Sequence, residues 1–188
     1  ETNTGRLINL INDLLDIEKL EAGQMQLILE QVKLQEIIEG SIASTGKANR
    51  VSLELWQPSS LEIVADRDRI IQAITNIINH SLGHSPEETF VQVNVNSGDD
   101  YTEITVADTA PTLGAADGEA MFDRFKSASA STAETQMSLS ESTGLAMPIA
   151  RKIVESHGGT IGVMPAGQSG NVFWVRLPVS RSLAQNTR

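Results

Sequence analysis

Residues 66–86 read DRDRIIQAITNIINHSLGHSP, and this stretch decides the fold because its apolar and polar positions fall on opposite sides of one helix. Asp66 is a suitable amino-terminal cap, and Pro86 follows the position where the helix must end. The apolar side consists of Ile70, Ile71, Ile74, Ile77, Ile78 and Leu82, and the opposite side of Gln72, Asn76, Asn79, His80 and Gly83. The pattern therefore predicts a helix over residues 66–83 that buries one face and presents a polar face opposite it.

The segments around this helix have the periodicities of further helices and of strands. Helical spacing occurs near residues 34–42 and at 146–154, and the glycines at 158 and 159 suit a left-handed stop. Alternating apolar residues predict strands near 51–55, 91–95, 104–106, 161–163 and 173–177. Residues 109–143 are mostly small and polar and predict a loop. This order of elements predicts an α+β fold, with helices on one face of a sheet.

The composition restricts the classes of function that the chain can have. With 188 residues, of which 40% are hydrophobic, the chain suits one globular domain plus an appendage, and no apolar run is long enough to span a bilayer. The absence of cysteine excludes disulfides and thiolate chemistry, and a cytoplasmic location is the default expectation. Acidic residues outnumber basic ones 24 to 14, which argues against nucleic-acid binding. Because the chain begins without methionine, we expect it to be a piece of a longer protein.

The amino-terminal residues predict a bundle-forming helix. Leu7, Leu10, Leu14 and Ile17 follow heptad a and d spacing, and further apolar positions widen the stripe beyond a two-stranded seam. Residues 6–22 alone cannot bury this face, so we expect a partner helix from an upstream segment, from a second copy of the chain, or from both. Homodimerisation through this helix follows as a hypothesis. The alternative is an ordinary amphipathic helix that packs on its own domain.

Three further positions have side chains or backbone suited to ligand binding or to a helix end. Asp108 ends a strand, where its carboxylate can accept a hydrogen bond from a ligand, although a strand-end aspartate is more often a turn residue. Residues 142–146 read STGLA before a helix, where exposed amides suit phosphate, and a lone glycine is otherwise a weak indication. His157 is interpreted as a surface residue at a helix end.

Taken together, these motifs resemble the ATP-binding domain of sensor histidine kinases over residues 6–178. The similar stretches are the N box at 66–80, the D-x-G-x-G box at 106–112, the F box at 121–125, the G-x-G-L-G-L-A-I box at 142–149, and the carboxyl-terminal stretches 153–163 and 173–178. Residues 10–17 and 19–23 look like the second helix of the dimerisation bundle. Each motif alone is a weak indication, whereas their number and order are a strong one.

The resemblance implies a fold and a division into domains. The implied fold is the Bergerat ATP-binding fold of the GHKL superfamily, a two-layer α/β sandwich with a mixed, mainly antiparallel sheet, preceded by a long bundle-forming helix. Residues 1–23 would form part of the dimerisation bundle, residues 24–179 the catalytic ATP-binding-type domain, and residues 180–188 a disordered tail. Phe122 and Phe125 of the F box would form the hinge of an ATP lid.

The resemblance also implies cofactors and partners. Intact relatives bind ATP with Mg2+ and transfer the γ-phosphoryl group to a histidine in the dimer bundle, and then to an aspartate on a response regulator. The implied protein is therefore a homodimer in a bacterial two-component system, with a response regulator or receiver domain as its partner. The phosphoacceptor histidine lies outside this chain. We expect no membrane contact by the fragment itself, whether or not the parent protein is anchored in a membrane.

The N box is only partly that of the family. Asn76 keeps the first asparagine, His80 takes the place of the metal-binding asparagine, and Gly83 takes that of a phosphate-contacting lysine. Asn79 or His80 is the candidate for a magnesium ligand, with Asn79 in a shifted register. Mg2+ prefers oxygen ligands, so His80 is a poor substitute for asparagine.

The two glycine boxes are altered as well. Asp108 keeps the acid that the resemblance assigns to adenine, but Ala110 and Thr112 replace glycines that permit positive φ and close approach of the backbone. The resemblance therefore implies a narrowed or reshaped adenine pocket. Thr143 and Gly144 remain as candidates for phosphate binding, because Gly144 is the only glycine left of three in its box.

These departures lead to one hypothesis and two alternatives. The leading hypothesis is a histidine-kinase-type domain with impaired or lost ATP binding, a pseudokinase that signals through dimerisation and partner contacts. The first alternative is an active sensor histidine kinase with a remodelled Mg-ATP site that uses Asn76, Asn79, Asp108, Thr143 and Gly144. The second is a scaffold that binds a response regulator and needs no nucleotide.

Overall fold

The computed structural model describes residues 26–55, 61–123, 144–167 and 169–179. Four predictions fall on other residues. The bundle helix with Leu7, Leu10, Leu14 and Ile17, the tail at 180–188, the phosphate candidate Thr143 and the hinge residue Phe125 all lie outside the described residues. Among the described residues, no helix combines the length and the apolar character that crossing a bilayer requires.

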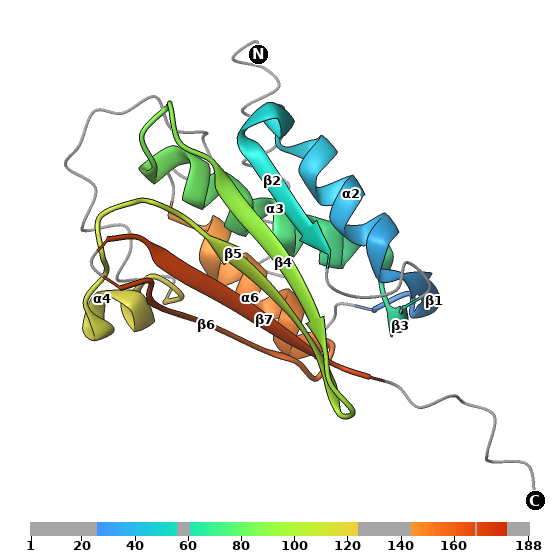
Figure 1. Cartoon of the computed structure of the whole chain (residues 1–188). Helices are drawn as coiled ribbons and strands as arrows, with labels where there is room; N and C mark the ends of the chain where they lie inside the picture. Colours follow the sequence, from blue (N-terminus) through green and yellow to red (C-terminus); the bar gives the residue numbers. More distant parts are fainter. Residues whose placement is uncertain (1–25, 56–60, 124–143, 168, 180–188) are drawn as a thin grey trace, which may run out of the picture.

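A five-stranded sheet forms one layer of the molecule, and three long helices cover one of its faces (Figure 1). The strand order is β2 (Val51–Leu55), β4 (Val91–Ser97), β5 (Tyr101–Ala107), β7 (Asn171–Pro178) and β6 (Thr160–Pro165). The covering helices are α2 (Leu34–Ser44), α3 (Arg67–His84) and α6 (Ala146–Ser156). Only the β2–β4 pair is parallel; the other three pairs are antiparallel. The predicted two-layer α+β sandwich with a mixed, mainly antiparallel sheet is confirmed.

Several short elements were not predicted from the sequence. Strands β1 (Glu30–Lys33) and β3 (Glu62–Ala65) form a separate two-stranded antiparallel sheet. A 3-10 turn occupies Ala48–Arg50, and helix α4 (Ala115–Ala120) lies within the stretch 109–143 that the sequence predicts as a loop. Each of these elements has at most six residues, too few for a hydrophobic period to be distinguished from chance.

The isoleucine face of α3 occupies the centre of the core. Ile70, Ile74, Ile77 and Ile78 have no measurable exposure, and each fully buried side chain of this size contributes roughly 1.5–3 kcal/mol relative to an exposed one. The helix packs between α2 and α6 and against strands β4 and β5. The inward residues of the sheet, which close the core from the other side, are Val91, Val93, Val95, Ile104, Val106, Phe173, Val175 and Leu177. The position of α3 is therefore fixed on several sides.

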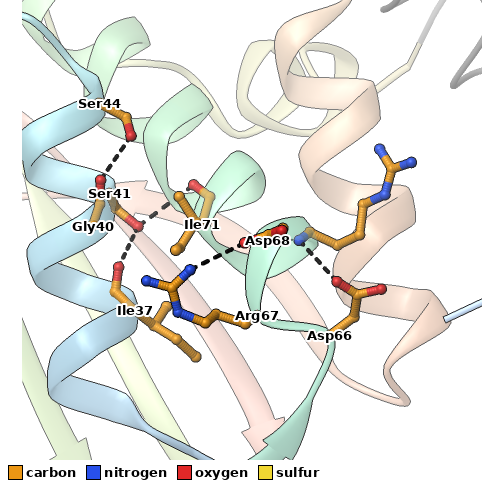
Figure 2. A network of polar contacts seen from close by, with 9 residues as sticks. Ile37, Gly40, Ser41, Ser44, Asp66, Arg67, Asp68 and Ile71 are labelled. Atoms are coloured by element: carbon orange, nitrogen blue, oxygen red, sulfur yellow. Dashed lines mark hydrogen bonds and ion pairs between the residues drawn. The ribbon is translucent and has the colours of Figure 1, made fainter. Parts of the chain in front are cut away.

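Helices α2 and α3 approach closely at a small residue. A side chain at Gly40 would meet the Cδ1 atom of Ile71 at 2.9 Å, so any larger residue there would require the end of the Ile71 side chain to move. The Oγ atom of the neighbouring Ser41 donates to the carbonyl of Ile37 at 2.8 Å and points toward the carbonyl of Ile71 at 3.4 Å (Figure 2). A buried hydroxyl in an apolar contact needs such partners.

Asp66 caps α3 and also joins two other segments to its amino terminus. Its Oδ1 atom accepts from the backbone N–H of Arg69 at 3.2 Å, and its Oδ2 atom accepts from the backbone N–H of Ile28 at 2.9 Å. The Asp66 N–H donates to Nε2 of His157 at 3.0 Å, while Nδ1 of His157 lies 2.8 Å from the carbonyl of Ile153. His157 lies at the carboxyl-terminal cap of α6, the helix end that the sequence predicted, but it is only half-exposed and also connects α6 to α3.

Because Asp66 caps α3, we expect its replacement to lower the free energy of unfolding more than replacement of the nearby Asp68. Replacing Asp66 with alanine removes the acceptors for two backbone N–H groups, and we expect a loss of about 1–2 kcal/mol in the free energy of unfolding. The matched control is Asp68→Ala, because Asp68 forms a solvent-exposed ion pair with Arg67 (Figure 2), for which we expect a loss below about 0.5 kcal/mol. Urea unfolding measures both, and equal losses in the two variants would contradict the capping role.

Candidate functional site

Hydrogen bonds bring the sequence motifs together along one edge of the helical layer. Nδ2 of Asn76 on α3 donates to the carbonyl of Ala146 at 3.1 Å, which joins α3 to the start of α6. The N–H of Thr109, just after β5, donates to Oγ of Ser85 at the carboxyl-terminal cap of α3, at 3.2 Å. The end of β5 is also joined to the start of β7, since the Asp108 N–H donates to the Asn171 carbonyl at 2.9 Å. Three of the predicted motifs therefore meet around α3.

Asp108 is buried at this meeting point, with an exposed fraction of only 6%. Its Oδ1 atom accepts three hydrogen bonds, from the backbone N–H groups of Ala110 at 3.1 Å and Asn171 at 2.8 Å, and from Nδ2 of Asn171 at 3.2 Å. Its Oδ2 atom has no hydrogen bond to any described residue. Because a carboxylate accepts with both oxygens, Oδ2 is available to a donor on a ligand.

The turn after Asp108 avoids the backbone geometry that its missing glycines would have allowed. No described residue other than glycine has a positive φ, so Ala110 and Thr112 adopt ordinary backbone conformations. The positive φ and the close approach lie instead at Gly170, where φ is +89° and any side chain would collide with the carbonyl oxygen of Asp108. Gly170 also donates its N–H to the Ala110 carbonyl at 2.9 Å. In this region, the position that requires glycine is Gly170, just before β7.

The two asparagines of the N box lie in different surroundings. The side chain of Asn76 already donates to α6, which leaves its Oδ1 atom as the group open to a ligand. Asn79 is half-buried and makes no hydrogen bond to the described residues. Gly83, in the place of the family's lysine, is half-buried near the end of α3 and adds no charge. The N box thus supplies amide groups to the site, without a cation at the position of the family's lysine.

His80 is turned toward the sheet and is held in its neutral form. Its ring packs edge-on against Phe173 of β7, with 5.5 Å between centroids, and lies 4.3 Å from the ring of His84. Part of the residue is accessible to solvent, but burial of the ring, together with repulsion from His84, lowers the pKa of His80 from 6.5 to about 3. At neutral pH the imidazole is therefore uncharged, and it makes an edge-to-face aromatic contact with Phe173.

The described residues fit a magnesium ion poorly. No group of three or more histidine, aspartate or glutamate side chains in the described part of the chain could hold a metal. At the position that the family gives to a metal-binding asparagine, His80 offers only a ring nitrogen, whereas Mg2+ requires hard oxygen ligands in near-octahedral geometry. Asn79 and Oδ1 of Asn76 offer amide oxygens, and Mg2+ bound with a nucleotide takes its other ligands from phosphates and water. The misfit therefore lies at His80.

The two remaining candidate residues that the structure describes, Phe122 and Gly144, lie close to the two ends of the segment 124–143. Gly144 precedes α6 with φ of +65°, a backbone conformation that only glycine adopts readily. Phe122 is 4% exposed, and the guanidinium of Arg151 on α6 lies 5.9 Å from its ring centroid. Arg151 also pairs at 3.0 Å with both Glu119 and Glu155. Phe122 is thus fixed to α6, as a hinge residue would need to be, while its role as a hinge stays a prediction.

The sequence reasoning missed Asn171. This residue is 1% exposed at the first position of β7, and its side chain contacts Asp108 and the turn that follows it. The only indication in the sequence was a polar residue between Gly170 and the apolar alternation of 173–177. Nothing in a local pattern shows that a residue 63 positions away would share a buried carboxylate with Asp108.

Comparison with known proteins agrees with this arrangement. The model of the family described as "Histidine kinase-, DNA gyrase B-, and HSP90-like ATPase" matches residues 65–181, more than half of the chain. The chain belongs to this ATPase family. Within the family, it is similar to the ATP-binding catalytic domains of two-component sensor histidine kinases, as the sequence motifs predicted.

Individual relatives support the same assignment. The chain is 25% identical over 186 residues to the signal transduction histidine-protein kinase BaeS of Escherichia coli (strain K12), a match that covers 97% of this chain and 39% of BaeS. The histidine kinase AdeS of Acinetobacter baumannii has the same fold, with a TM-score of 0.71 and 19% identity over 93% of this chain and 79% of that one. Full-length ShkA in complex with AMPPNP has a TM-score of 0.72 and 21% identity, over 92% of this chain and 35% of that one. The chain thus spans less than half the length of BaeS.

The surroundings of His80 predict how stability depends on pH. Because its folded pKa of about 3 lies below the unfolded value of 6.5, the unfolded state binds the extra proton, and stability falls as the pH drops below 6.5. Relative to His80→Phe, which keeps a ring against Phe173, we expect the wild type to lose about 2 kcal/mol more between pH 7 and pH 5. Urea unfolding at both pH values measures this difference.

The matched control for this prediction is His84→Gln. It removes the weaker cause of the pKa shift, the repulsion from His84, and leaves the burial of His80 in place. We therefore expect it to keep most of the pH dependence of the wild type. A His80→Phe variant that loses stability as steeply as the wild type would show that the ring is not desolvated.

Proposed function

We propose that this chain is a histidine-kinase-type domain in which the use of Mg-ATP is impaired, and which signals through dimerisation and partner contacts. The observation that carries the proposal is the state of His80. A neutral imidazole packed on Phe173 occupies the position that the family gives to an oxygen ligand of Mg2+. The altered N box therefore favours weakened metal binding over a metal site of unusual composition.

The size of the expected defect follows from how such sites act. Phosphoryl transfer depends mainly on positioning and on neutralising the charge of the triphosphate. Loss of one metal-linked or charged contact commonly costs about tenfold to a thousandfold in affinity or rate. Here two such contacts are altered on one helix, because Gly83 also stands in the place of a cationic lysine. Their combined loss is sufficient to remove efficient turnover.

The second candidate function is an active sensor histidine kinase with a remodelled site, and Asp108 favours it. This carboxylate is buried and ordered by three hydrogen bonds, and its Oδ2 atom remains available to an amino group such as that of adenine. A chain with no use for nucleotide has no evident need for this arrangement, which also weighs against the nucleotide-independent scaffold. We therefore propose that the base-binding half of the site is retained while the metal half is impaired.

The proposed partners follow from the family rather than from the described residues. A homodimer through the bundle helix, with Leu7, Leu10, Leu14 and Ile17 at its seam, would bring the domain to its phosphoacceptor or to a regulatory neighbour. A response regulator or receiver domain is the proposed downstream partner, in the cytoplasm of a bacterium. The similarity to BaeS, a signal transduction histidine-protein kinase, supports this proposal.

Calorimetric titration with ATP separates the two candidates. For the wild type, we expect weak binding, with an affinity that changes by less than about threefold when Mg2+ is added. The double variant His80→Asn with Gly83→Lys restores an oxygen ligand and a cation, so we expect Mg2+ to strengthen its ATP binding by about tenfold or more.

The controls for this titration use the same helix and the same site. His84→Asn makes the same chemical change one turn further along α3 and should add no Mg2+ dependence. Asp108→Asn should weaken the remaining nucleotide binding of the wild type. Tight, Mg2+-dependent binding of ATP by the wild type would reject the impaired site and favour the active kinase. Binding no stronger than millimolar and unaffected by Asp108→Asn would reject the active kinase.

A further inference from the structure

Asn171 uses all of its side-chain polar atoms to hold the turn that follows β5. Nδ2 donates to Oδ1 of Asp108 at 3.2 Å and to the carbonyl of Pro111 at 3.1 Å, and Oδ1 accepts from the N–H of Leu113 at 2.8 Å. The exposed fraction of Asn171 is only 1%, so water does not compete for these hydrogen bonds. A buried amide with three protein partners keeps a fixed orientation, because losing any one of them leaves an unsatisfied polar group. We call this buried Asn171 side chain the strut.

The strut fixes the orientation of the Asp108 carboxylate. Two of the three N–H groups that contact Oδ1 belong to Asn171, and the third belongs to Ala110 within the turn. Oδ1 therefore faces β7, and the plane of the carboxylate is set by donors on both sides. The remaining oxygen, Oδ2, faces away from this set and has no hydrogen bond to a described residue. Asn171, through its backbone and its side chain, thus helps to set, together with Ala110, which way Oδ2 points.

The turn itself depends on the same strut. Without glycines at 110 and 112, the turn has ordinary φ values, and it meets β7 through Gly170 instead. Its two ends are held at Asp108 and Leu113, both of which bond to the Asn171 side chain. Loss of this side chain would remove its bonds to Pro111 and Leu113 and one of the three donors to the carboxylate, while the backbone bonds of Asn171, Ala110 and Gly170 would remain.

We propose that Asn171 is a positioning residue that aims Oδ2 of Asp108 at the base of a bound nucleotide and so sets base selectivity. This inference rests on the proposed retention of the base-binding half of the site. A carboxylate only accepts hydrogen bonds, so it favours a purine with an amino group at position 6 over one with a carbonyl there. Adenosine and inosine diphosphates differ in that way and share the same phosphates.

The test compares the affinities for ADP and IDP in the absence of Mg2+, so that the metal half of the site contributes nothing to either affinity. For the wild type, we expect ADP to bind at least about tenfold more tightly than IDP. In Asn171→Ser, the preference should fall to within about threefold, because Oδ1 of Asp108 loses the Nδ2 donor and the turn that carries the Ala110 N–H loses its bonds to the Asn171 side chain. The carboxylate is then held less firmly by the two backbone donors that remain. The matched control, Asn96→Ser, changes an exposed asparagine on β4 and should keep the wild-type ratio.

The ratio of the affinity for ADP to the affinity for IDP is the informative quantity. A purely structural role for Asn171 would weaken both nucleotides equally and leave the ratio unchanged. Amide hydrogen exchange without nucleotide gives a second readout, in which Leu113 N–H should exchange about tenfold faster in Asn171→Ser than in the wild type. In the wild type, the Asn171 side-chain amide protons should exchange far more slowly than those of Asn96, a measurement that stands even if the variant fails to fold.

Each outcome bears on a definite part of the proposal. An unchanged ADP-to-IDP ratio in folded Asn171→Ser would overturn the role in base selectivity. Unchanged Leu113 exchange, or rapid exchange of the Asn171 side-chain amide in the wild type, would overturn the positioning role, whatever the protein binds. Failure of the wild type to bind either nucleotide would overturn base selectivity together with the proposed base site, while protected Leu113 and Asn171 amides would still identify the strut.

Discussion

Burial of the isoleucine face of α3 is the constraint on which the rest of the structure depends. Ile70, Ile74, Ile77 and Ile78 are excluded from solvent between α2, α6 and the sheet, and this contact sets the rotation of the helix about its axis. Because helix residues are related by fixed angles, the same contact determines where the opposite residues lie. Asn76 is placed against α6 and His80 against β7 for this reason. The chemistry of the polar face can therefore change while its geometry persists.

The two halves of the site are supported by different parts of the molecule. The acidic half rests on β5 and β7, where Asp108, Gly170 and Asn171 are joined through backbone and side-chain hydrogen bonds. The amide and imidazole half rests on α3 and depends on the helix rotation. Loss of function in one half need not disturb the other, since no described hydrogen bond joins the side chains of His80 and Asp108. This separation gives a physical reason why a base contact can outlast a metal contact.

The sequence predicted the long elements and the motif positions, and it failed where the structure depends on contacts between distant residues. The period of 3.6 on α3 and the alternation on β4, β5 and β7 were sufficient, because burial of one face dictates both patterns. The four-residue strands β1 and β3 have no such pattern of their own and exist through pairing with each other. Among the candidate site residues, Asp108 was selected from its strand-end position, but the contact from Asn171 was not predicted. The helix-end position of His157 was predicted, but its acceptor role toward Asp66 was not, because it joins residues 91 positions apart.

The residues that depart from the family pattern are also ones that the fold tolerates easily. His80 and Gly83 are both half-buried, so neither position is closed to water. The neutral His80 ring packs against Phe173, and Gly83 places no charge beside it. In the glycine turn, Ala110 is buried at 4% exposure without a positive φ, because Gly170, just before β7, and Asn171, its first residue, supply the close approach and the hydrogen bonds. The altered residues are therefore compatible with the family's fold.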